Sequence, residues 1–265
     1  MHVNVGHPKK LHKTPNQLIA AGLFSLICAT SLLIWLQTGP TRIQMGATPI
    51  LFSAWGLSVT ALCASSKDLK SNIKVAVLLG VLVRVLFIGQ APLLSDDLYR
   101  YLWEGMALNH GYNPLTTTPD SIAHLNPALH GEVNHGTISS IYPPLALGWF
   151  RLIDWLQGGV VAAQSLAVIA DCAVILGIWK IVTSRRSSTW PVWLYALHPL
   201  AVMENGWSAH IDGLAIAFAV WGVWAWEQRR LGLATALSIL GIATKVFSPA
   251  DKTQTSGLAW RLACF

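Results

Sequence analysis

The stretch LIAAGLFSLICATSLLIWL, residues 18–36, contains no charged residue over 19 consecutive positions. A membrane-spanning α-helix needs roughly 20 predominantly apolar residues, so this length predicts a span rather than a buried core helix. A second uncharged stretch of the same length covers residues 48–66. In the whole chain of 265 residues, 53% are hydrophobic and 11% are charged, against about 25% charged in soluble domains. The chain is therefore predicted to be an all-α integral membrane protein.

Apolar blocks continue along most of the chain. They cover residues 75–90, 141–156, 159–181, 190–203, 211–226 and 231–247. Together with the first two blocks they predict a polytopic transmembrane helical bundle of about seven to eight membrane segments. The block that begins at Tyr142-Pro143-Pro144 is interpreted as re-entrant, because a full crossing there would place Arg185 and Arg186 outside the cell.

Charge divides the chain into regions with different predicted locations. Residues 92–142 hold five acidic residues and one arginine, a formal charge of −4, whereas the short connections between apolar blocks are basic. Because Lys and Arg are enriched in cytoplasmic loops, the acidic loop is predicted outside. The predicted regions are a cytoplasmic basic N-terminus (1–17), three transmembrane helices (18–91), a large outer loop carrying interfacial helices (92–142), further transmembrane or re-entrant helices (143–247) and an irregular polar tail (248–265).

This pattern predicts a multi-pass protein of the plasma or inner membrane, with its active face outside. The net charge of +6 belongs to cytoplasmic connections and not to a nucleic-acid-binding face, so no nucleic-acid partner is expected. The tail 248–265 turns abruptly polar after an apolar block. We expect a truncated or frameshifted reading frame there, with a genuine soluble tail as the alternative.

The sharpest polar cluster is SDDLYRYLWEG, residues 95–105, directly after the third apolar block. The adjacent carboxylates of Asp96 and Asp97 are costly beside a bilayer, which favours a functional role as general base or metal ligand. Arg100 is placed to pair with a phosphate or with a nearby acid, and Glu104 belongs to the same cluster. The alternative is a solvated loop helix whose first turn accepts acidic residues.

A second polar cluster, ENGWSAHIDG, covers residues 204–213 and separates two apolar blocks. Glu204, His210 and Asp212 there predict a backbone that departs from α-helix where it lines a cavity, because irregular backbone facing lipid is not tolerated. A short polar hairpin in water is the alternative. Arg84 and Asp171 each stand alone in an apolar block, and we expect them to pair with one another across helices.

No metal centre is predicted. The histidines of the outer loop lack the i, i+4 spacing of a zinc helix, and the four cysteines show no CxxC spacing. No cofactor is therefore expected with certainty, although the loop carboxylates could bind a divalent cation through their oxygen atoms.

Four stretches in this order resemble the GT-C superfamily of integral membrane glycosyltransferases. They are SDDLYRYLWEG with HGYNPL, then IYPPLALGW, then LHPLAVMENGWSAHIDGLA, then ATKVF. The resemblance covers about residues 75–247 and is nearest to the bacterial polyprenyl-phosphate-mannose-dependent mannosyltransferases and the related glycosyltransferase 87 group. Such enzymes usually continue through several more helices.

The resemblance implies that Asp96 or Asp97 is the catalytic base and that later polar residues line the donor or acceptor site. The donor- and acceptor-binding residues expected on this basis are Arg100, Glu104, Glu204, His210, Asp212 and Lys245. Of these, Arg100 and Lys245 are the cations expected to hold the departing phosphate.

The predicted function is transfer of a sugar, with mannose as the first candidate, from a polyprenyl-phosphate donor to a glycan or lipid acceptor at the outer face of the membrane. The expected partners are this donor, the acceptor and membrane lipids. Two alternatives stay open. A membrane transporter would use ionisable residues on interrupted helices, and an inactive fragment or scaffold of a truncated gene would have no activity of its own.

Overall fold

The computed structural model describes residue 28 and residues 53–57, 59, 73–92 and 95–245. Within these residues all regular structure is helical, so the predicted all-α class is confirmed for this part of the chain. The elements in chain order are α3 (Ile73–Val85), α4 (Asp97–Asn109), the 3-10 helix η1 (Pro119–Leu125), α5 (Pro127–His130), α6 (Pro144–Trp155), α7 (Gly159–Ser184), α8 (Trp190–Leu197), α9 (Pro199–Ala201), the π-helix η2 (Val202–Trp207), α10 (Asp212–Glu227) and α11 (Leu231–Thr244).

Several predicted regions lie outside the described residues. They are the basic N-terminus, the first apolar stretch apart from Cys28, most of the second stretch and the tail 248–265. In the described part, α7 is long and apolar enough to cross a membrane, and a second crossing is reached if α9, η2 and α10 count as one bent span. The predicted number of seven to eight segments is therefore not established by these helices.

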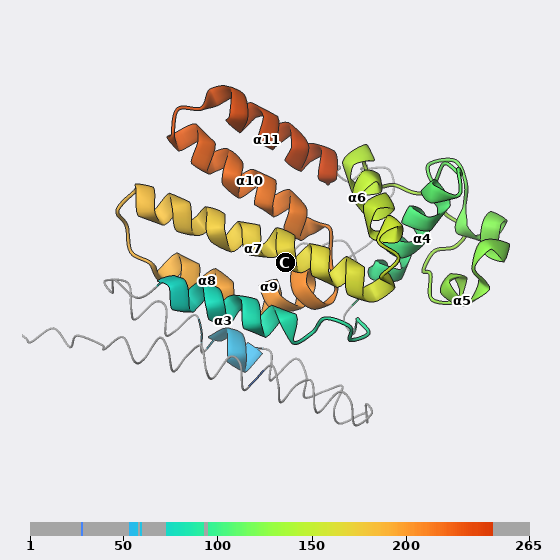
Figure 1. Ribbon diagram of the computed structural model, residues 1–265, viewed down its shortest axis with the longest axis horizontal. Helices are drawn as coiled ribbons and strands as arrows, with labels where there is room; N and C mark the ends of the chain where they lie inside the picture. The colour runs from blue at the N-terminus through green and yellow to red at the C-terminus, as the bar shows by residue number, and fades with distance from the viewer. Residues whose placement is uncertain (1–27, 29–52, 58, 60–72, 93–94, 246–265) are drawn as a thin grey trace, which may run out of the picture.

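The long helices lie side by side in a layered arrangement (Figure 1). α7 packs against α10 on one side and against α3 on the other, and α11 covers α10. Small residues allow these approaches, because a Cβ added at Gly177 of α7 would lie 2.6 Å from the Val220 side chain of α10. Around α3, α7 and α8 this arrangement buries an apolar cluster that includes Trp193, Phe87 and Ile175.

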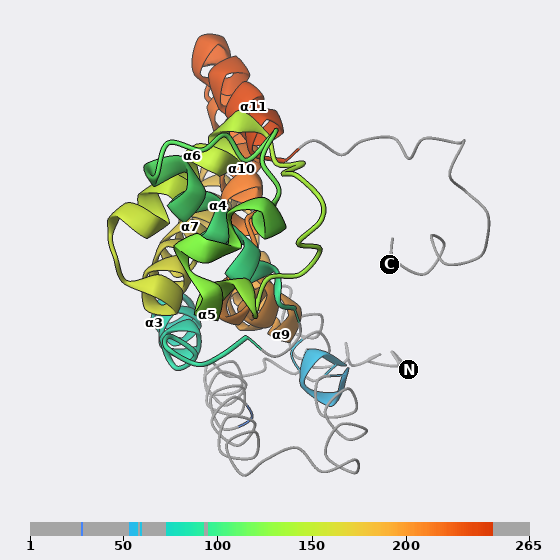
Figure 2. The ribbon, with the colours of Figure 1, turned by 90° about the vertical axis from the view of Figure 1, so that its right-hand side faces the viewer.

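The described part of the acidic loop, residues 95–142, forms a helical cap at one end of this layer (Figure 1), the end that faces the viewer in Figure 2. Here α4 packs closely on α6, since a Cβ at Gly105 would lie 2.1 Å from the carbonyl oxygen of Phe150. The 12 residues of α6 extend about 18 Å at 1.5 Å per residue. That is shorter than the hydrocarbon core of about 30 Å, so α6 by itself does not reach across a bilayer.

The second polar cluster lies at a sharp bend. The helix α8 ends just before Pro199. The residue before this proline, His198, has the extended backbone that residues before proline prefer. The chain then forms the π-helix η2 and turns by 117° into α10. The predicted departure from α-helix at this cluster is confirmed.

The predicted pair of Arg84 and Asp171 is also confirmed. Both side chains are fully buried and form an ion pair between α3 and α7. The hydroxyl of Tyr195 and the amide of Asn205 donate hydrogen bonds to the other oxygen of Asp171. Arg84 also donates to the backbone carbonyl of Ala196 at 2.6 Å. This network joins α3, α7, α8 and η2, and thereby holds the bend in place.

Candidate active site

The aspartate pair sits at the N-terminal edge of α4. Asp96 immediately precedes the helix and Asp97 is its first residue, with the Asp97 amide donating to Oγ of Ser95 at 3.2 Å. Acidic residues are favourable at this end of a helix because its unpaired N–H groups carry partial positive charge. Leu98 and Tyr101 are buried in the packing against α6, which fixes the start of α4 and with it the position of the two aspartates. Asp96 is exposed, whereas the Asp97 side chain is 39% exposed.

Asn134, on the loop between α5 and α6, joins the two aspartates. Its Nδ2 donates hydrogen bonds to Oδ1 of Asp96 at 2.7 Å and to Oδ1 of Asp97 at 3.0 Å. One amide nitrogen carries two hydrogens, so each carboxylate receives one of them. The bridge places the two negative charges around a common donor.

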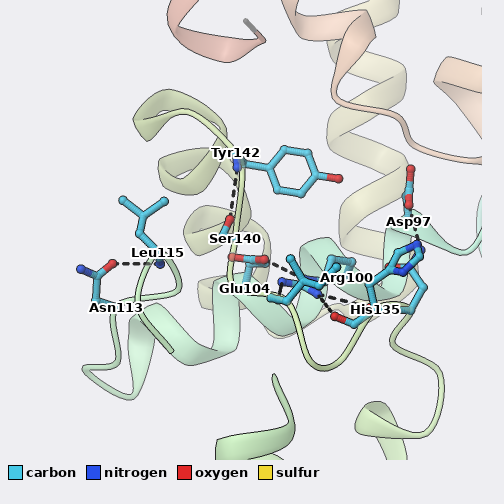
Figure 3. Close-up of polar contacts among 10 residues, drawn as sticks. Asp97, Arg100, Glu104, Asn113, Leu115, His135, Ser140 and Tyr142 are labelled. Carbon is cyan, nitrogen blue, oxygen red and sulfur yellow. Dashed lines mark hydrogen bonds and ion pairs between the residues drawn. The ribbon is translucent and has the colours of Figure 1, made fainter. Parts of the chain in front are cut away.

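Arg100 holds the same loop from the inside of the cap (Figure 3). Its Nε donates to Oε1 of Glu104 at 2.7 Å, and its Nη atoms donate to the backbone carbonyls of Asn134, His135 and Ile138 at 3.2, 3.0 and 2.7 Å. The arginine is 6% exposed. Four of its five N–H groups are thus engaged within the protein.

Glu104 is 1% exposed. Desolvation raises the pKa of its carboxyl above the ordinary 4.5, while hydrogen bonds from Arg100 and Ser140 and the charge of Arg100 act in the opposite direction. Of the predicted binding residues, Arg100 and Glu104 therefore contact each other and the loop, and the structure does not bring them to the surface that Asp97 shares with the second cluster. A binding role for either stays a prediction.

His210 connects the two polar clusters. Its Nδ1 lies 3.1 Å from Oε2 of Glu204, and its Nε2 lies 4.0 Å from Oδ2 of Asp97. Among the described residues Nε2 has no hydrogen-bond partner, although the atom is buried. The residue before it, Ala209, has a φ of +53°. Residues other than glycine rarely adopt this conformation, and such strained backbone is often found at functional sites. The strained turn directs His210 toward the outer loop.

Asp212 and Lys245 meet beside this bridge. Asp212 begins α10 and Lys245 follows the end of α11, and Nζ of the lysine lies 2.5 Å from Oδ1 of the aspartate. Both line a pocket of about 880 Å³. Glu204 and His210 contribute to its polar part. Its apolar part is formed by Ile178, Trp190, Leu194, Leu200 and Ile216, among others. A pocket lined by both charged and apolar side chains suits a ligand that has both a charged and an apolar part.

Aromatic side chains of α4, α6 and the Tyr-Pro-Pro stretch pack together next to the site. Tyr101 stacks on Phe150, with 4.4 Å between ring centroids, and meets Tyr142 edge-on. Burial and the negative charge of Asp97 are the main causes that raise the pKa of Tyr142 to about 12, so its hydroxyl stays protonated at neutral pH. Figure 3 shows this hydroxyl directed toward the side on which Asp97 lies. The Tyr-Pro-Pro stretch thus places a hydroxyl group within the electrostatic influence of the aspartate.

Sequence reasoning missed Asn134 and the position of Tyr142. No periodic pattern marks Asn134, because it lies in an irregular loop. In the part of the chain that the structure describes, no group of three or more His, Cys, Asp or Glu side chains has the arrangement of a metal site. The paired oxygens of Asp96 and Asp97 are the atoms that could contact a divalent cation.

A family model described as alpha-(1->6)-mannopyranosyltransferase, N-terminal domain, matches residues 19–251. The chain belongs to this family. The predicted resemblance to integral membrane mannosyltransferases is thereby confirmed. Both polar clusters and all predicted site residues lie within the part that matches the mannopyranosyltransferase family.

The chain is also similar in sequence to alpha-(1->6)-mannopyranosyltransferase A of Corynebacterium glutamicum. The two are 26% identical over an alignment of 185 positions, which covers 63% of this chain and 36% of the relative. The chain thus spans little more than a third of the length of this mannopyranosyltransferase. No solved structure matches the chain.

Proposed function

We propose that the chain provides the catalytic face of a membrane mannosyltransferase, which moves mannose from a polyprenyl-phosphate donor to a glycan or lipid acceptor. The observation that carries this proposal is the convergence of Asp97, Glu204, His210, Asp212 and Lys245 beside one half-apolar pocket. Membership of the alpha-(1->6)-mannopyranosyltransferase family supports the sugar and the reaction class. The proposed setting is a bundle of seven to eight segments, with the acidic loop outside.

Asp97 is the proposed general base. Its Oδ2 faces His210 and the second cluster, whereas Asp96 is exposed and forms no hydrogen bond or ion pair with that cluster among the described residues. In an inverting displacement the acceptor oxygen bonds to the anomeric carbon, and the bond from that carbon to the phosphate oxygen breaks with its electrons left on the phosphate. The proton of the acceptor hydroxyl passes to Asp97.

Lys245 is the proposed ligand of the departing phosphate. Negative charge builds on that group during transfer, and a fixed cation there lowers the barrier. Asp212 holds the lysine while no donor is bound, and the donor phosphate would take the place of this carboxylate. The apolar wall of the pocket offers a surface for the polyprenyl chain. The proposed reaction does not require a metal, although a divalent cation at the aspartate pair could also stabilise the negative charge that builds on the departing phosphate.

The decisive experiment measures transfer of labelled mannose from a polyprenyl-phosphate donor in membranes that contain the chain, alone and joined to the remaining segment of a longer family member. Asp97→Ala should reduce transfer by at least about a hundredfold, because general-base catalysis contributes about 10²–10⁴. Asp96→Ala should cost less. The matched control is Asp120→Ala, since Asp120 lies in the same loop but pairs with His130. Transfer that survives Asp97→Ala unchanged would refute the assignment of the base.

A transporter is the second candidate, and the 117° bend between η2 and α10 favours it. Transporters often bind substrates where helices are interrupted by ionisable residues. Uptake of labelled mannosyl donors or sugars into proteoliposomes, without any transfer to acceptors, would support this candidate. The position of Asp97 in the cap, within the acidic loop, argues for chemistry at the surface instead.

A further inference from the structure

Asn134 is placed to control the orientation of the aspartate pair. We propose that Asn134 is a positioning residue that binds Oδ1 of Asp97 and leaves Oδ2 as the oxygen that accepts the proton, and that Arg100 fixes Asn134 for this task. This inference rests on the proposed function, because it assumes that Asp97 is the base. It assigns separate tasks to the two oxygens of one carboxylate.

The hydrogen bonds of Asn134 support this assignment. Nδ2 lies 3.0 Å from Oδ1 of Asp97 and 2.7 Å from Oδ1 of Asp96, so both of its hydrogens are used. The other oxygen of Asp97 has no hydrogen bond among the described residues and lies 4.0 Å from Nε2 of His210. A carboxylate held by one oxygen cannot rotate freely, and the open oxygen keeps its direction toward the second cluster.

Arg100 explains why a loop residue can act as a fixed support. The guanidinium binds the carbonyl oxygens of Asn134 and of two following loop residues, His135 and Ile138. A planar fork with several simultaneous hydrogen bonds defines a geometry that a lysine cannot reproduce. Glu104 holds the other edge of the same group at 2.7 Å and compensates its charge in the buried environment.

The backbone next to Asn134 adopts an unusual conformation that is consistent with this constraint. His135 has a φ of +50°, and residues other than glycine adopt that conformation only where their surroundings enforce it. The bond from Arg100 to the His135 carbonyl is such an enforcing contact. The loop is therefore held in a shape that presents the Asn134 amide to both aspartates.

Adjacent carboxylates repel one another, and a shared donor offsets that repulsion. Substituting Asp for Asn134 keeps the size of the side chain but exchanges the donor for a third carboxylate. Asn134→Asp should therefore turn the pair away from its present orientation, whereas Asn134→Ala should only release it. Both variants should lower kcat more than they raise KM, because the residue acts on the base and not on a substrate.

The first test compares steady-state transfer by the wild-type chain, Asn134→Ala and Asn134→Asp in membranes. We expect kcat to fall about tenfold to a hundredfold, the loss typical of a misplaced catalytic group, with KM for the acceptor changed less than about threefold. The matched control is Asn113→Ala, because Asn113 lies in the same acidic loop and, within the described part of the chain, its Oδ1 accepts only from the nearby Leu115 amide. Unchanged kcat in both Asn134 variants would overturn the inference.

A double-mutant cycle separates positioning from general damage to the fold. In the background of Asp97→Ala, the substitution Asn134→Ala should have no further effect on the residual rate, since the group that it positions is gone. Fully multiplicative losses would overturn the inference. Arg100→Lys should reproduce the loss of kcat seen for Asn134→Ala, because the loop carbonyls lose the fork.

A second readout does not depend on transfer. Carbodiimide labelling of carboxyl groups in the purified full chain, located by mass spectrometry, should become faster at Asp96 and Asp97 in Asn134→Ala and stay constant at Asp154, which accepts from Asn109 instead. Constant labelling at the pair would overturn the proposed support even in an active enzyme. If labelling changes while Asp97→Ala leaves transfer intact, the support stands and the proposed base fails.

Discussion

Nε2 of His210 lies 4.0 Å from Oδ2 of Asp97, although the two residues are separated by more than a hundred positions and belong to different polar clusters. The imidazole reaches this place because Glu204 holds its other nitrogen at 3.1 Å. Carboxylate, imidazole and carboxylate thus form a line from η2 to the first residue of α4. The proposed reaction would take place next to this line.

Substitution of His210 tests the line directly. His210→Ala should reduce transfer about tenfold to a hundredfold, because Asp97 loses its neighbour on the side of the open oxygen. Glu204→Gln should cost less, since its amide oxygen can still accept from Nδ1. Labelled transfer at saturating donor is the measurement, with the exposed His124→Ala as control. Equal rates for His210→Ala and the control would contradict the prediction.

The contact of Lys245 with Asp212 leads to a prediction on the donor. Lys245→Ala should raise KM for the donor about tenfold, as expected for one lost charge-assisted contact to a phosphate. Lys180→Ala, which removes an exposed lysine of α7, should leave KM unchanged. Donor titrations at constant acceptor provide the measurement. An increase confined to the KM for the acceptor would show that Lys245 does not bind the donor phosphate.

The buried pair of Arg84 and Asp171 should dominate the stability of the layer. Arg84→Ala leaves a buried carboxylate without its cation, and removal of one partner of a buried pair costs about 3–5 kcal/mol. Arg185→Ala on the surface, which breaks an exposed pair with Glu227, should cost about 1 kcal/mol or less. Thermal unfolding in detergent compares the two variants. A similar small shift for both would show that the buried pair is dispensable.

Gly105 tests the packing that positions the aspartates. A methyl group there would overlap the Phe150 carbonyl, and overpacking costs about 1–3 kcal/mol. Gly105→Ala should therefore lower both stability and transfer, because α4 carries Asp97. Gly148→Ala is the matched control, since Gly148 lies on α6, the helix of Phe150, and nothing lies within 4 Å of the added atom. The control should behave as the wild type in both assays.

Glu104 predicts a pH dependence of stability. Burial raises its pKa above 4.5 in the folded state, so the folded protein binds this proton more tightly than the unfolded chain does. The stabilising contribution is fully present below about pH 4.5 and is lost as the pH rises through the raised folded value. Glu104→Gln stays neutral and still accepts from Arg100. The melting temperature of Glu104→Gln minus that of the wild type should therefore increase as the pH rises from about 4 to about 7.

Part of the site could be predicted from local sequence. The break at residues 204–213 and the pairing of Arg84 with Asp171 followed from ionisable residues in apolar surroundings, where an unpaired charge is too costly to persist. The choice between Asp96 and Asp97 could not be predicted, because the two are neighbours in sequence and differ only in what they face. The task of Arg100 was equally hidden, since its partners are backbone carbonyls of a distant loop.

Hydropathy along the chain was sufficient for the all-α class, and four short motifs were sufficient for the family resemblance, because both can be recognised within short windows of sequence. The line from Asp97 through His210 to Glu204 depends on folding. It requires the 117° bend before α10, the strained turn at Ala209 and the packing of α4 on α6 to occur together. Distances of 3–4 Å between remote side chains arise from such combined packing, and local periodicity contains no information about them.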